Sequence, residues 1–342
     1  MIDDIVEIIY EVIKDYRCED GYKMTKEHIK EWGLQFGDDA EFVLEEFAHI
    51  VHQVYLSKDG AYKFLNTLLD FLCSTYKARD LQSVLADTCF MDMQPQGKSQ
   101  DILLQMLNEL VLSKTGQDLS YYADCPKKHY VYLDDVLASG KTVADDLIEW
   151  LNVGSNAEDV KNKKIDVKVI TICRHDLGYS LQWFRITKNT DNFDAMKLIP
   201  AHCCYRIENN ATEYESALNI AMPIKTNLSE RALQYFNCLN ADEKYEKYGF
   251  RKEGYPRKET FFSNPENRDR FEQIIVNKGV ELIQSAANPG PYVRPLGLVN
   301  PKYKTLGMGT HFFTWRNIPN NSPLVYWWEI QGTNWISLFP KK

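Results

Sequence analysis

Two neighbouring carboxylates and a short loop of small residues follow one another in the stretch VYLDDVLASGKT, residues 131–142. The loop ASGKT, residues 138–142, lies between a predicted strand and a helix that begins near Lys141. Small residues let backbone amides converge, and the helix N-terminus adds a positive partial charge. Ser139 and Thr142 add hydroxyl donors. Together these features predict a binding site for a phosphomonoester.

Asp134 and Asp135 directly precede this loop, although two carboxylates repel a phosphate group. They are therefore expected to bind a different part of the same ligand. A ribose 5-phosphate meets both requirements, because the loop can hold its phosphate while the carboxylates accept hydrogen bonds from the 2- and 3-hydroxyls. The same negative charges would support an oxocarbenium-like centre if the glycosidic bond breaks.

The phosphate loop of nucleoside triphosphatases is the main alternative, because it also ends in Gly-Lys-Ser/Thr. That loop requires a glycine five residues before its Gly-Lys, and position 135 of this chain is aspartate. The second Gly-Lys of the region, in QPQGKSQ (residues 94–100), lacks that glycine as well. The sequence therefore argues against a nucleoside triphosphatase.

With these residues in view, VYLDDVLASGKT resembles the motif by which type I phosphoribosyltransferases bind phosphoribosyl pyrophosphate (PRPP). That motif is an apolar strand, two acidic residues and a loop rich in Gly and Ser/Thr that ends in Thr. The resemblance implies that Asp134 and Asp135 bind the ribose hydroxyls and indirectly help to place a Mg²⁺ ion. The residues that it implies for the 5-phosphate are Ala138, Ser139, Gly140, Lys141 and Thr142.

The same resemblance implies a loop for the pyrophosphate after the first strand of the sheet, where this chain has QPQGKS. Its residues for that role are Gly97, Lys98 and Ser99. Lys98 and the loop amides would stabilise the departing pyrophosphate while Asp134 and Asp135 hold the ribose, so these three side chains are the implied catalytic residues. The chain departs from ordinary members between this loop and the PRPP strand. Only residues 113–128 are present where those members have two strands and a long catalytic loop.

Segments at both ends carry a narrower resemblance, to the PRTase-CE group of phosphoribosyltransferase-like proteins in bacterial conflict systems. They are EWGLQF (31–36), AHIVHQVYLSKDGAYKFL (48–65), LGMGTHFFTWRNIPNNSPLVYWW (306–328) and WISLFPKK (335–342). This resemblance implies a role in anti-phage defence. It also implies partners among the other subunits of a defence system, including a retron reverse transcriptase with its nucleic acid. A homo-oligomer is left open.

The elements that position the motifs read as an α/β fold. Short apolar runs at 88–93, 130–133, 167–173 and 198–207 predict strands, and helical periodicity at 101–112 and 142–153 predicts helices between them. This alternation is typical of a parallel sheet covered on both faces, here of the phosphoribosyltransferase (Rossmann-like) type, with ligands at the carboxyl ends of the strands. We expect a helical N-terminal region over residues 1–80, the core over 81–210, and an α+β C-terminal cap or substrate region over 211–342. In the last of these, residues 228–249 and 267–286 look helical.

The C-terminal stretch TWRNIPNNSPLVYWWEI (314–330) has two readings. In the first it is an acceptor site, in which Trp315 stacks on a base, Arg316 steadies a phosphate, and Asn317 and Asn320 read the edge of the base. In the second it is a strand–turn–strand whose tryptophans pack the core and whose asparagines shape the turn.

The composition of the 342 residues excludes several classes of protein. A net charge of −8 argues against a broad basic surface for duplex nucleic acid, and no apolar run is long enough to cross a bilayer. The acidic N-terminal segment lacks the pattern of a signal peptide, and the eight scattered cysteines lack a C-x-x-C pair. We therefore expect a cytoplasmic protein with reduced cysteines and no membrane contact.

The leading functional hypothesis is a defence effector that binds PRPP or a nucleotide with Mg²⁺ and acts at C1 of ribose 5-phosphate. The reaction would be phosphoribosyl transfer, pyrophosphorolysis or nucleotide depletion. The alternative is a catalytically inactive subunit that senses PRPP or a nucleotide, which the missing catalytic loop favours. A third reading is a nucleic-acid-bound partner in a larger complex.

Overall fold

The computed structural model describes residues 1–190, 193–209, 217–239 and 249–341. The chain forms two compact units, one of residues 59–207 and one that joins residues 1–58 to residues 208–342. These units cross the boundaries of the three consecutive regions expected from the sequence. The first 58 residues of the expected helical region belong to the same unit as the C-terminal region.

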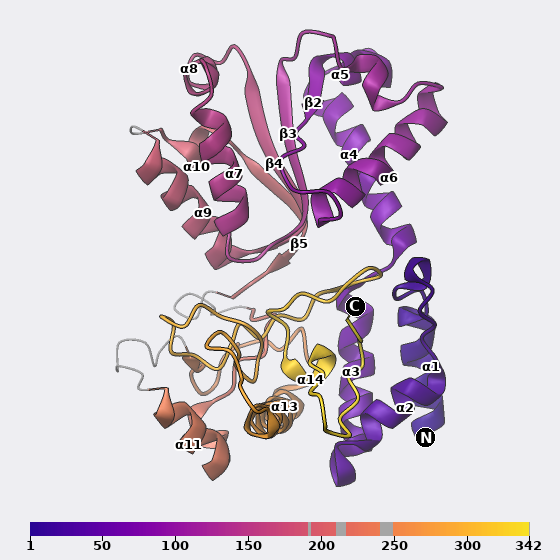
Figure 1. Cartoon of the computed structure of the whole chain (residues 1–342), viewed down its shortest axis with the longest axis vertical. Coiled ribbons are helices and arrows are strands. Elements are labelled where there is room, and N and C mark those ends of the chain that lie inside the picture. The colour runs from indigo at the N-terminus through magenta and orange to yellow at the C-terminus, as the bar shows by residue number, and fades with distance from the viewer. Residues whose placement is uncertain (191–192, 210–216, 240–248, 342) are drawn as a thin grey trace. The chain divides into compact units, whose positions relative to one another are not determined.

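A four-stranded parallel sheet forms the centre of the unit of residues 59–207 (Figure 1). Its strands are β2 (Thr88–Phe90), β3 (His129–Leu137), β4 (Asp166–His175) and β5 (Ala201–Ile207), adjacent in that order. All three pairings are parallel, with His129 opposite Asp166 and Asp134 opposite Thr171. The strand positions and the α/β class expected from the sequence are confirmed.

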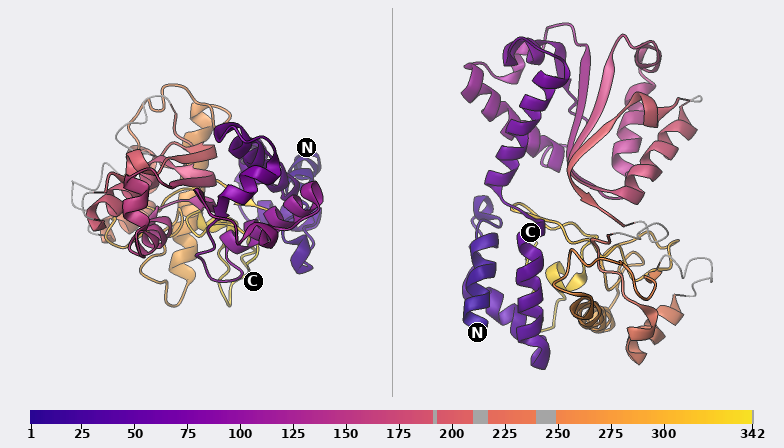
Figure 2. Two further views of the ribbon diagram at one scale, coloured as in Figure 1. Left: turned by 90° about the horizontal axis from the view of Figure 1, so that it is seen from above. Right: turned by 180° about the vertical axis from the view of Figure 1, so that it is seen from behind.

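Helices cover both faces of this sheet. They are α4 (Lys58–Thr75), α5 (Leu81–Asp87), α6 (Ser99–Thr115), α7 (Lys141–Leu151), α8 (Asn156–Lys161), α9 (Asp176–Asn189) and α10 (Ala195–Leu198). In Figures 1 and 2, α7 and α9 lie on one face, and α4 and α6 lie on the other. The connections that follow β2 and β3 therefore lead to opposite faces from neighbouring strand ends. Ligands of open α/β sheets bind at such a position.

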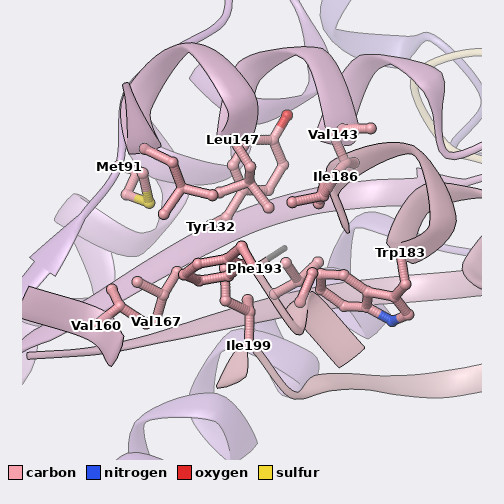
Figure 3. Packing of buried hydrophobic residues seen from close by; sticks show 14 of the residues in the cluster. Met91, Tyr132, Val143, Leu147, Val160, Val167, Trp183, Ile186, Phe193 and Ile199 are labelled. Atoms are coloured by element: carbon pink, nitrogen blue, oxygen red, sulfur yellow. The ribbon is translucent and has the colours of Figure 1, made fainter. Parts of the chain in front are cut away.

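The core of this unit lies between the sheet and α7 and α9 (Figure 3). Apolar side chains of β3 and β4, among them Val167 and Val169 of β4, pack against Leu147 of α7 and Ile186 of α9. All four are at most 2% exposed. Burial of this kind contributes about 25 cal/mol per Å² of apolar surface, so it fixes the ends of β3 and α7 in relation to each other.

Strand β3 is longer than the apolar run that predicted it. Asp134 and Asp135 lie within the strand, because the ladder with β4 continues through Asp134↔Thr171 to Leu137↔Arg174. The sequence suggested that the strand stops before the carboxylates, since charged residues are rare in buried strands. The polar groups described in the next subsection make this extension tolerable.

The other unit is built around α3 (Ala40–Val54), which packs against α1 (Ile2–Ile13), α2 (Lys26–Leu34) and α13 (Pro265–Ser285). It also contains the short strands β1 (Tyr55–Leu56) and β6 (Phe313–Thr314), and the helices α11 (Glu230–Cys238) and α14 (Leu324–Trp327). Thr25 caps α2, its Oγ1 accepting from the amide of His28 at 3.1 Å. The expected helix at 228–249 is present as α11, and its part beyond 239 lies outside the described residues apart from residue 249.

Buried charges stabilise the irregular part of this unit. Arg268 is 1% exposed and pairs with Glu259 at 2.5 Å and with Glu272 at 3.2 Å. It also donates to the carbonyl oxygens of Leu218 and Ile220, whose chain segments form no long strand or helix. The guanidinium therefore replaces the backbone partners that regular structure would supply.

The C-terminal segment also differs from the expected pair of strands. Only Phe313 and Thr314 form a strand, β6, and it pairs in parallel with β1. Residues 324–327 form the short helix α14 instead. The reason is tertiary, because Pro323 begins this helical turn and the aromatic rings of Tyr326 and Phe313 pack together with a centroid separation of 5.3 Å.

Two further expectations concern bulk properties. Within the described ranges, no helix has the length and hydropathy needed to span a bilayer. All eight cysteines lie in described segments and are free thiols in the structure.

Candidate functional site

Asp134 lies at the centre of the candidate site, near the carboxyl end of β3, and is 5% exposed. Its Oδ1 accepts hydrogen bonds from the Ser99 hydroxyl at 2.6 Å and from the Asp135 amide at 2.8 Å. Its Oδ2 accepts from the side-chain amide of Gln94 at 3.0 Å. All three donors are neutral, so among the described residues this buried carboxyl has hydrogen-bond partners but no cationic one.

Burial is the main cause that raises the pKa of Asp134 to about 7, and the charge of Asp135 adds to it. The bonds from Ser99, Asp135 and Gln94 act in the opposite direction. Asp135 is partly exposed, and its Oδ1 accepts from the amide of Val136 at 2.6 Å. A neighbouring donor or cation from a ligand would therefore favour the ionised pair.

The predicted pyrophosphate loop lies next to this pair. Ser99 begins α6 and is joined to Asp134, which brings together the two segments that the sequence suggested separately. Gly97 has a left-handed backbone, with φ +80°, and its amide donates to Asp101 Oδ2 at 2.6 Å. Lys98 is exposed, and among the described residues its ammonium has no hydrogen-bond or ion-pair partner. It is therefore available to an anion.

Two glutamines that the sequence analysis did not single out hold this loop against β3. The fully buried Gln100 accepts from the amides of Met93 and Gln94, at 2.7 and 3.0 Å, and donates to the carbonyl of Leu133 at 3.1 Å. Gln94 donates from one nitrogen to Asp134 and to the Tyr132 hydroxyl, the latter at 2.9 Å. In the sequence, the only indication of these contacts was that Gln94 and Gln100 flank the predicted loop in QPQGKSQ.

Tyr132 extends this set of contacts to the helix that follows the phosphate loop. Its hydroxyl donates to Asp146 Oδ2 at 2.6 Å, and Asp146 lies in the second turn of α7. A continuous set of side-chain hydrogen bonds therefore runs from Ser99 through Asp134, Gln94 and Tyr132 to Asp146. It links the predicted pyrophosphate loop, strand β3 and helix α7.

The predicted phosphate loop is shaped by close contacts with α9. Gly140 has φ +67° and directly precedes α7. A Cβ at Gly140 would lie 2.4 Å from the carbonyl oxygen of Gly178, and one at Gly178 would lie 1.9 Å from that of Ala138. Both positions therefore require glycine, because any side chain would push α9 away from the loop.

The loop keeps several donors for an anion. Among the described residues, the amides of Ser139, Gly140 and Thr142 donate to no acceptor. The amide of Lys141 donates to the Ser139 hydroxyl at 3.3 Å, and the Lys141 ammonium pairs with Asp145 at 2.5 Å. The backbone therefore matches the sequence-based expectation, whereas the Lys141 charge is directed along the helix.

The four residues of the proposed acceptor site lie in the unit of residues 1–58 and 208–342, whereas 97–99 and 134–142 lie in the other unit. Trp315 is 3% exposed and donates to Glu19 at 3.3 Å, and Arg316 is partly exposed. Asn317 shapes a turn by accepting from the amide of Ile318, and Asn320 accepts from the Lys341 ammonium. These contacts belong to the packing of the unit, and an acceptor role stays a prediction.

The donor set of the site suits a hard divalent cation bound mainly through its ligand. Two adjacent carboxylates offer oxygen donors, which Mg²⁺ prefers, and a cation bound near Asp134 would offset the burial and the charge of Asp135 that raise its pKa. Among the described residues, no three His, Cys, Asp or Glu side chains are grouped as an independent metal site. A Mg²⁺ ion would therefore rely on ligand oxygens, with Asp134 and Asp135 in a supporting role.

Comparisons with known proteins bear on the whole chain. A family model described as PRTase-CE matches residues 29–341, which includes both loops, the paired carboxylates and the C-terminal segment. Neither a curated protein nor a solved structure gave a significant match.

Proposed function

The chain belongs to the PRTase-CE family and is a phosphoribosyltransferase-like protein, and from this premise we propose that it binds PRPP or a nucleotide together with Mg²⁺. We further propose that it acts at C1 of the ribose 5-phosphate. The observation that carries the proposal is the hydrogen bond between Ser99 and Asp134. It places the predicted pyrophosphate loop directly beside the carboxylate pair, as a ribose that carries a 1-pyrophosphate would require.

In the proposed complex, each end of the ligand has its own binding segment. The free amides of Ser139, Gly140 and Thr142 hold the 5-phosphate at the N-terminus of α7. Asp134 and Asp135 accept hydrogen bonds from the ribose hydroxyls. Gly97 and Lys98 bind the pyrophosphate, for which Lys98 supplies an exposed positive charge.

The chemistry follows from this arrangement. A nucleophile attacks C1, the bond from C1 to the pyrophosphate oxygen breaks, and the electron pair leaves with pyrophosphate. Lys98 stabilises the charge that develops on the leaving group, and the carboxylate pair stabilises the positive charge that develops on the ribose. When bound, Mg²⁺ supplies further neutralisation of the pyrophosphate. The reverse reaction is pyrophosphorolysis of a nucleotide, and water as the nucleophile would deplete PRPP or nucleotides.

Calorimetric titration with PRPP and Mg²⁺ tests the binding step. The Asp134→Asn/Asp135→Asn variant should bind at least about 100-fold more weakly, because two charge-assisted contacts are lost. The Asp124→Asn/Glu149→Gln variant removes the same charge from two exposed positions of the same unit and should bind like the wild type. No heat of binding by the wild type would refute the proposal.

Turnover is a separate question, and a specific observation favours the inactive alternative. The connection between α6 and β3 contains only a short 3₁₀ helix, Leu119–Tyr122. The Lys127 ammonium holds this connection close to the amino ends of β2 and β3, because it donates to the carbonyl oxygens of Ala86 and Tyr122. This segment therefore lies far from the site that a catalytic loop shields. PRPP binding without pyrophosphate release over a panel of bases, and without nucleotide loss in extracts, would establish a sensing subunit.

Family membership also motivates a biological proposal. The protein would act in the cytoplasm as part of a bacterial defence system, with partners that include a reverse transcriptase and its nucleic acid. Phage challenge of cells that express the complete gene cluster tests this role. The Asp134→Asn/Asp135→Asn variant should abolish protection, and unchanged protection would separate the defence role from the ribose-phosphate site.

A further inference from the structure

Gln182 of α9 is a fully buried polar side chain that has no hydrogen-bond partner among the residues that the structure describes. It is 0% exposed, and neither its Oε1 nor its Nε2 makes a hydrogen bond. Burying a carboxamide without partners is costly, and most buried polar groups in proteins are paired. A leucine would fill the same space without this cost. The glutamine therefore calls for an explanation other than the packing of α9.

The position of Gln182 points to the phosphate loop. A Cβ built on Gly140 would lie 2.7 Å from Cβ of Gln182 and 3.3 Å from its Cα. Gly178 lies four residues earlier on α9, hence on the same face, and its backbone touches the Ala138 carbonyl. The face of α9 that carries both residues therefore packs directly on the loop of residues 138–140.

The direction of the side chain follows from helix geometry. Side chains in an α-helix lean toward the N-terminus of their helix, so Gln182 extends from its own turn toward the turn of Gly178. This direction leads toward the loop. The amides of Ser139 and Gly140 there also lack acceptors among the described residues. Two sets of unpaired polar groups, one on α9 and one on the loop, thus lie at the same place.

We propose that Gln182 is a further phosphate-binding residue, whose carboxamide forms its hydrogen bonds when the loop holds an anion. Nε2 donates to the bound phosphate, and Oε1 accepts from a loop amide. The inference rests on the proposed function, because it assumes that residues 138–142 bind the 5-phosphate. A neutral carboxamide suits this position, since it offers a donor to the phosphate and an acceptor to the backbone without adding a buried charge.

The Gln182→Leu variant tests the proposal with two probes, ribose 5-phosphate and inorganic pyrophosphate, each titrated in the presence of Mg²⁺. Affinity for ribose 5-phosphate should fall by about tenfold, as expected for a lost hydrogen bond to a charged group. Affinity for pyrophosphate should not change, because that anion binds at the other loop. The Tm should stay the same or rise, because an unpaired buried carboxamide has been replaced by an apolar group of similar size.

Two other variants make the result specific. Gln182→Glu keeps one oxygen acceptor but replaces the donor by a negative charge, so it should weaken ribose 5-phosphate binding more than Gln182→Leu does. Thr88→Val is the matched control, because Thr88 is 4% exposed and its hydroxyl is likewise buried without a partner, at the opposite end of the sheet. It should leave both affinities unchanged.

The outcomes separate this inference from the proposed function. If the wild type binds ribose 5-phosphate and Gln182→Leu binds it equally well, Gln182 is not part of the phosphate site, and the proposed function is unaffected. An equal loss of affinity for ribose 5-phosphate and pyrophosphate would also overturn the inference, because it would indicate a general structural defect. If the wild type binds neither PRPP nor ribose 5-phosphate, the proposed function fails and the inference fails with it.

Discussion

Asp166 lies at the amino ends of the strands in the four-stranded sheet, and Asp134 lies near their carboxyl ends. Each accepts three hydrogen bonds. Asp166 receives them from His129, from the Lys168 ammonium and from the Tyr76 hydroxyl, the last at 2.8 Å. These bonds outweigh the effect of burial and lower the pKa of Asp166 to about 2. Asp134 receives only neutral donors, and burial together with Asp135 raises its pKa to about 7.

The difference lies in the charge of the partners rather than in the number of bonds. At the amino ends of the strands, the negative charge of Asp166 is neutralised by the Lys168 ammonium of the protein itself. No charge from a ligand is needed there. At the carboxyl ends of the strands a buried carboxyl lies beside a second one, and the exposed ammonium of Lys98 has no partner within the described part of the chain. Perturbed carboxyl groups of the second kind are typical of binding sites, because a ligand can supply the missing donors.

The largest expected effect is on the free energy of unfolding when Asp166 or Asp134 is replaced by asparagine. Asp166→Asn should lower the free energy of unfolding at pH 7 by about 1 to 2 kcal/mol, once solvent screening of a partly exposed group is allowed for. Asp134→Asn should leave it unchanged or raise it by about 1 kcal/mol at pH 8, since a desolvated charge is removed. Urea denaturation measures both. If both variants lost a similar amount of unfolding free energy, both aspartates would serve mainly to stabilise the fold.

The pH dependence of these two effects has opposite signs. Asp166 has a lowered pKa, so its contribution to stability is present above its ordinary pKa of about 4 and is lost as the pH falls toward 2. Asp134 has a raised pKa, so its ionisation costs stability as the pH rises from about 4 to 7. Denaturation curves measured between pH 2 and pH 8 should show both variants approaching the wild type at the acid end. At the alkaline end Asp166→Asn should be less stable than the wild type and Asp134→Asn at least as stable.

Ligand affinity should follow the ionisation of Asp134. The ionised carboxylate is a stronger acceptor for the proposed ribose hydroxyls than the neutral acid is. Affinity for PRPP with Mg²⁺ should therefore fall as the pH is lowered from 8 to 6, by up to about tenfold. The phosphates of the ligand also titrate in this range, and Asp134→Asn serves as the control for them. If the variant shows the same pH dependence as the wild type, Asp134 does not determine it.

A smaller effect is expected at Asp101, which accepts the amide of Gly97 in the pyrophosphate loop. This carboxylate occupies a donor that the pyrophosphate would use, and the bond from Gly97 is the main cause of its lowered pKa. Asp101→Asn should tighten pyrophosphate binding about threefold and leave ribose 5-phosphate binding unchanged. Asp80→Asn is the control, because Asp80 likewise accepts from a backbone amide at a helix N-terminus, that of Ser83 in α5, and lies outside the candidate site. Weaker pyrophosphate binding by Asp101→Asn would mean that Asp101 supports the loop and does not compete with the anion.

Much of the fold was predictable because its signals are local. The four strands and the helices α6 and α7 follow from apolar runs and from helical periodicity within a few residues of each other. The grouping of the N-terminal helices with the C-terminal segment was not predictable in this way. It depends on contacts such as Trp32 Nε1 to the Val325 carbonyl at 2.9 Å and Tyr16 to the Pro340 carbonyl at 3.0 Å. No local pattern encodes a partner about 300 residues away.

The candidate site shows the same division. The positions of the paired carboxylates and of the two loops were inferred from residues 94–100 and 131–142 alone. The roles of Gln94 and Gln100 were missed, because glutamine in a polar loop is usually exposed. Gln182 was missed for a related reason, since it lies in a helix more than 40 residues after the loop that it touches.

The amino-acid sequence by itself determined which groups stand at the end of β3: an apolar strand, two carboxylates and a small-residue loop before a helix. Their order in the chain and the chemistry of an anion-binding loop are local properties. Only the tertiary structure decided that Asp134 is buried among neutral donors while Asp166 lies beside Lys168. A carboxyl pKa depends on desolvation and on charges and donors close in space. Asp135 and Lys168 can be read from the chain, whereas the burial of Asp134 and the bond from His129 to Asp166 cannot.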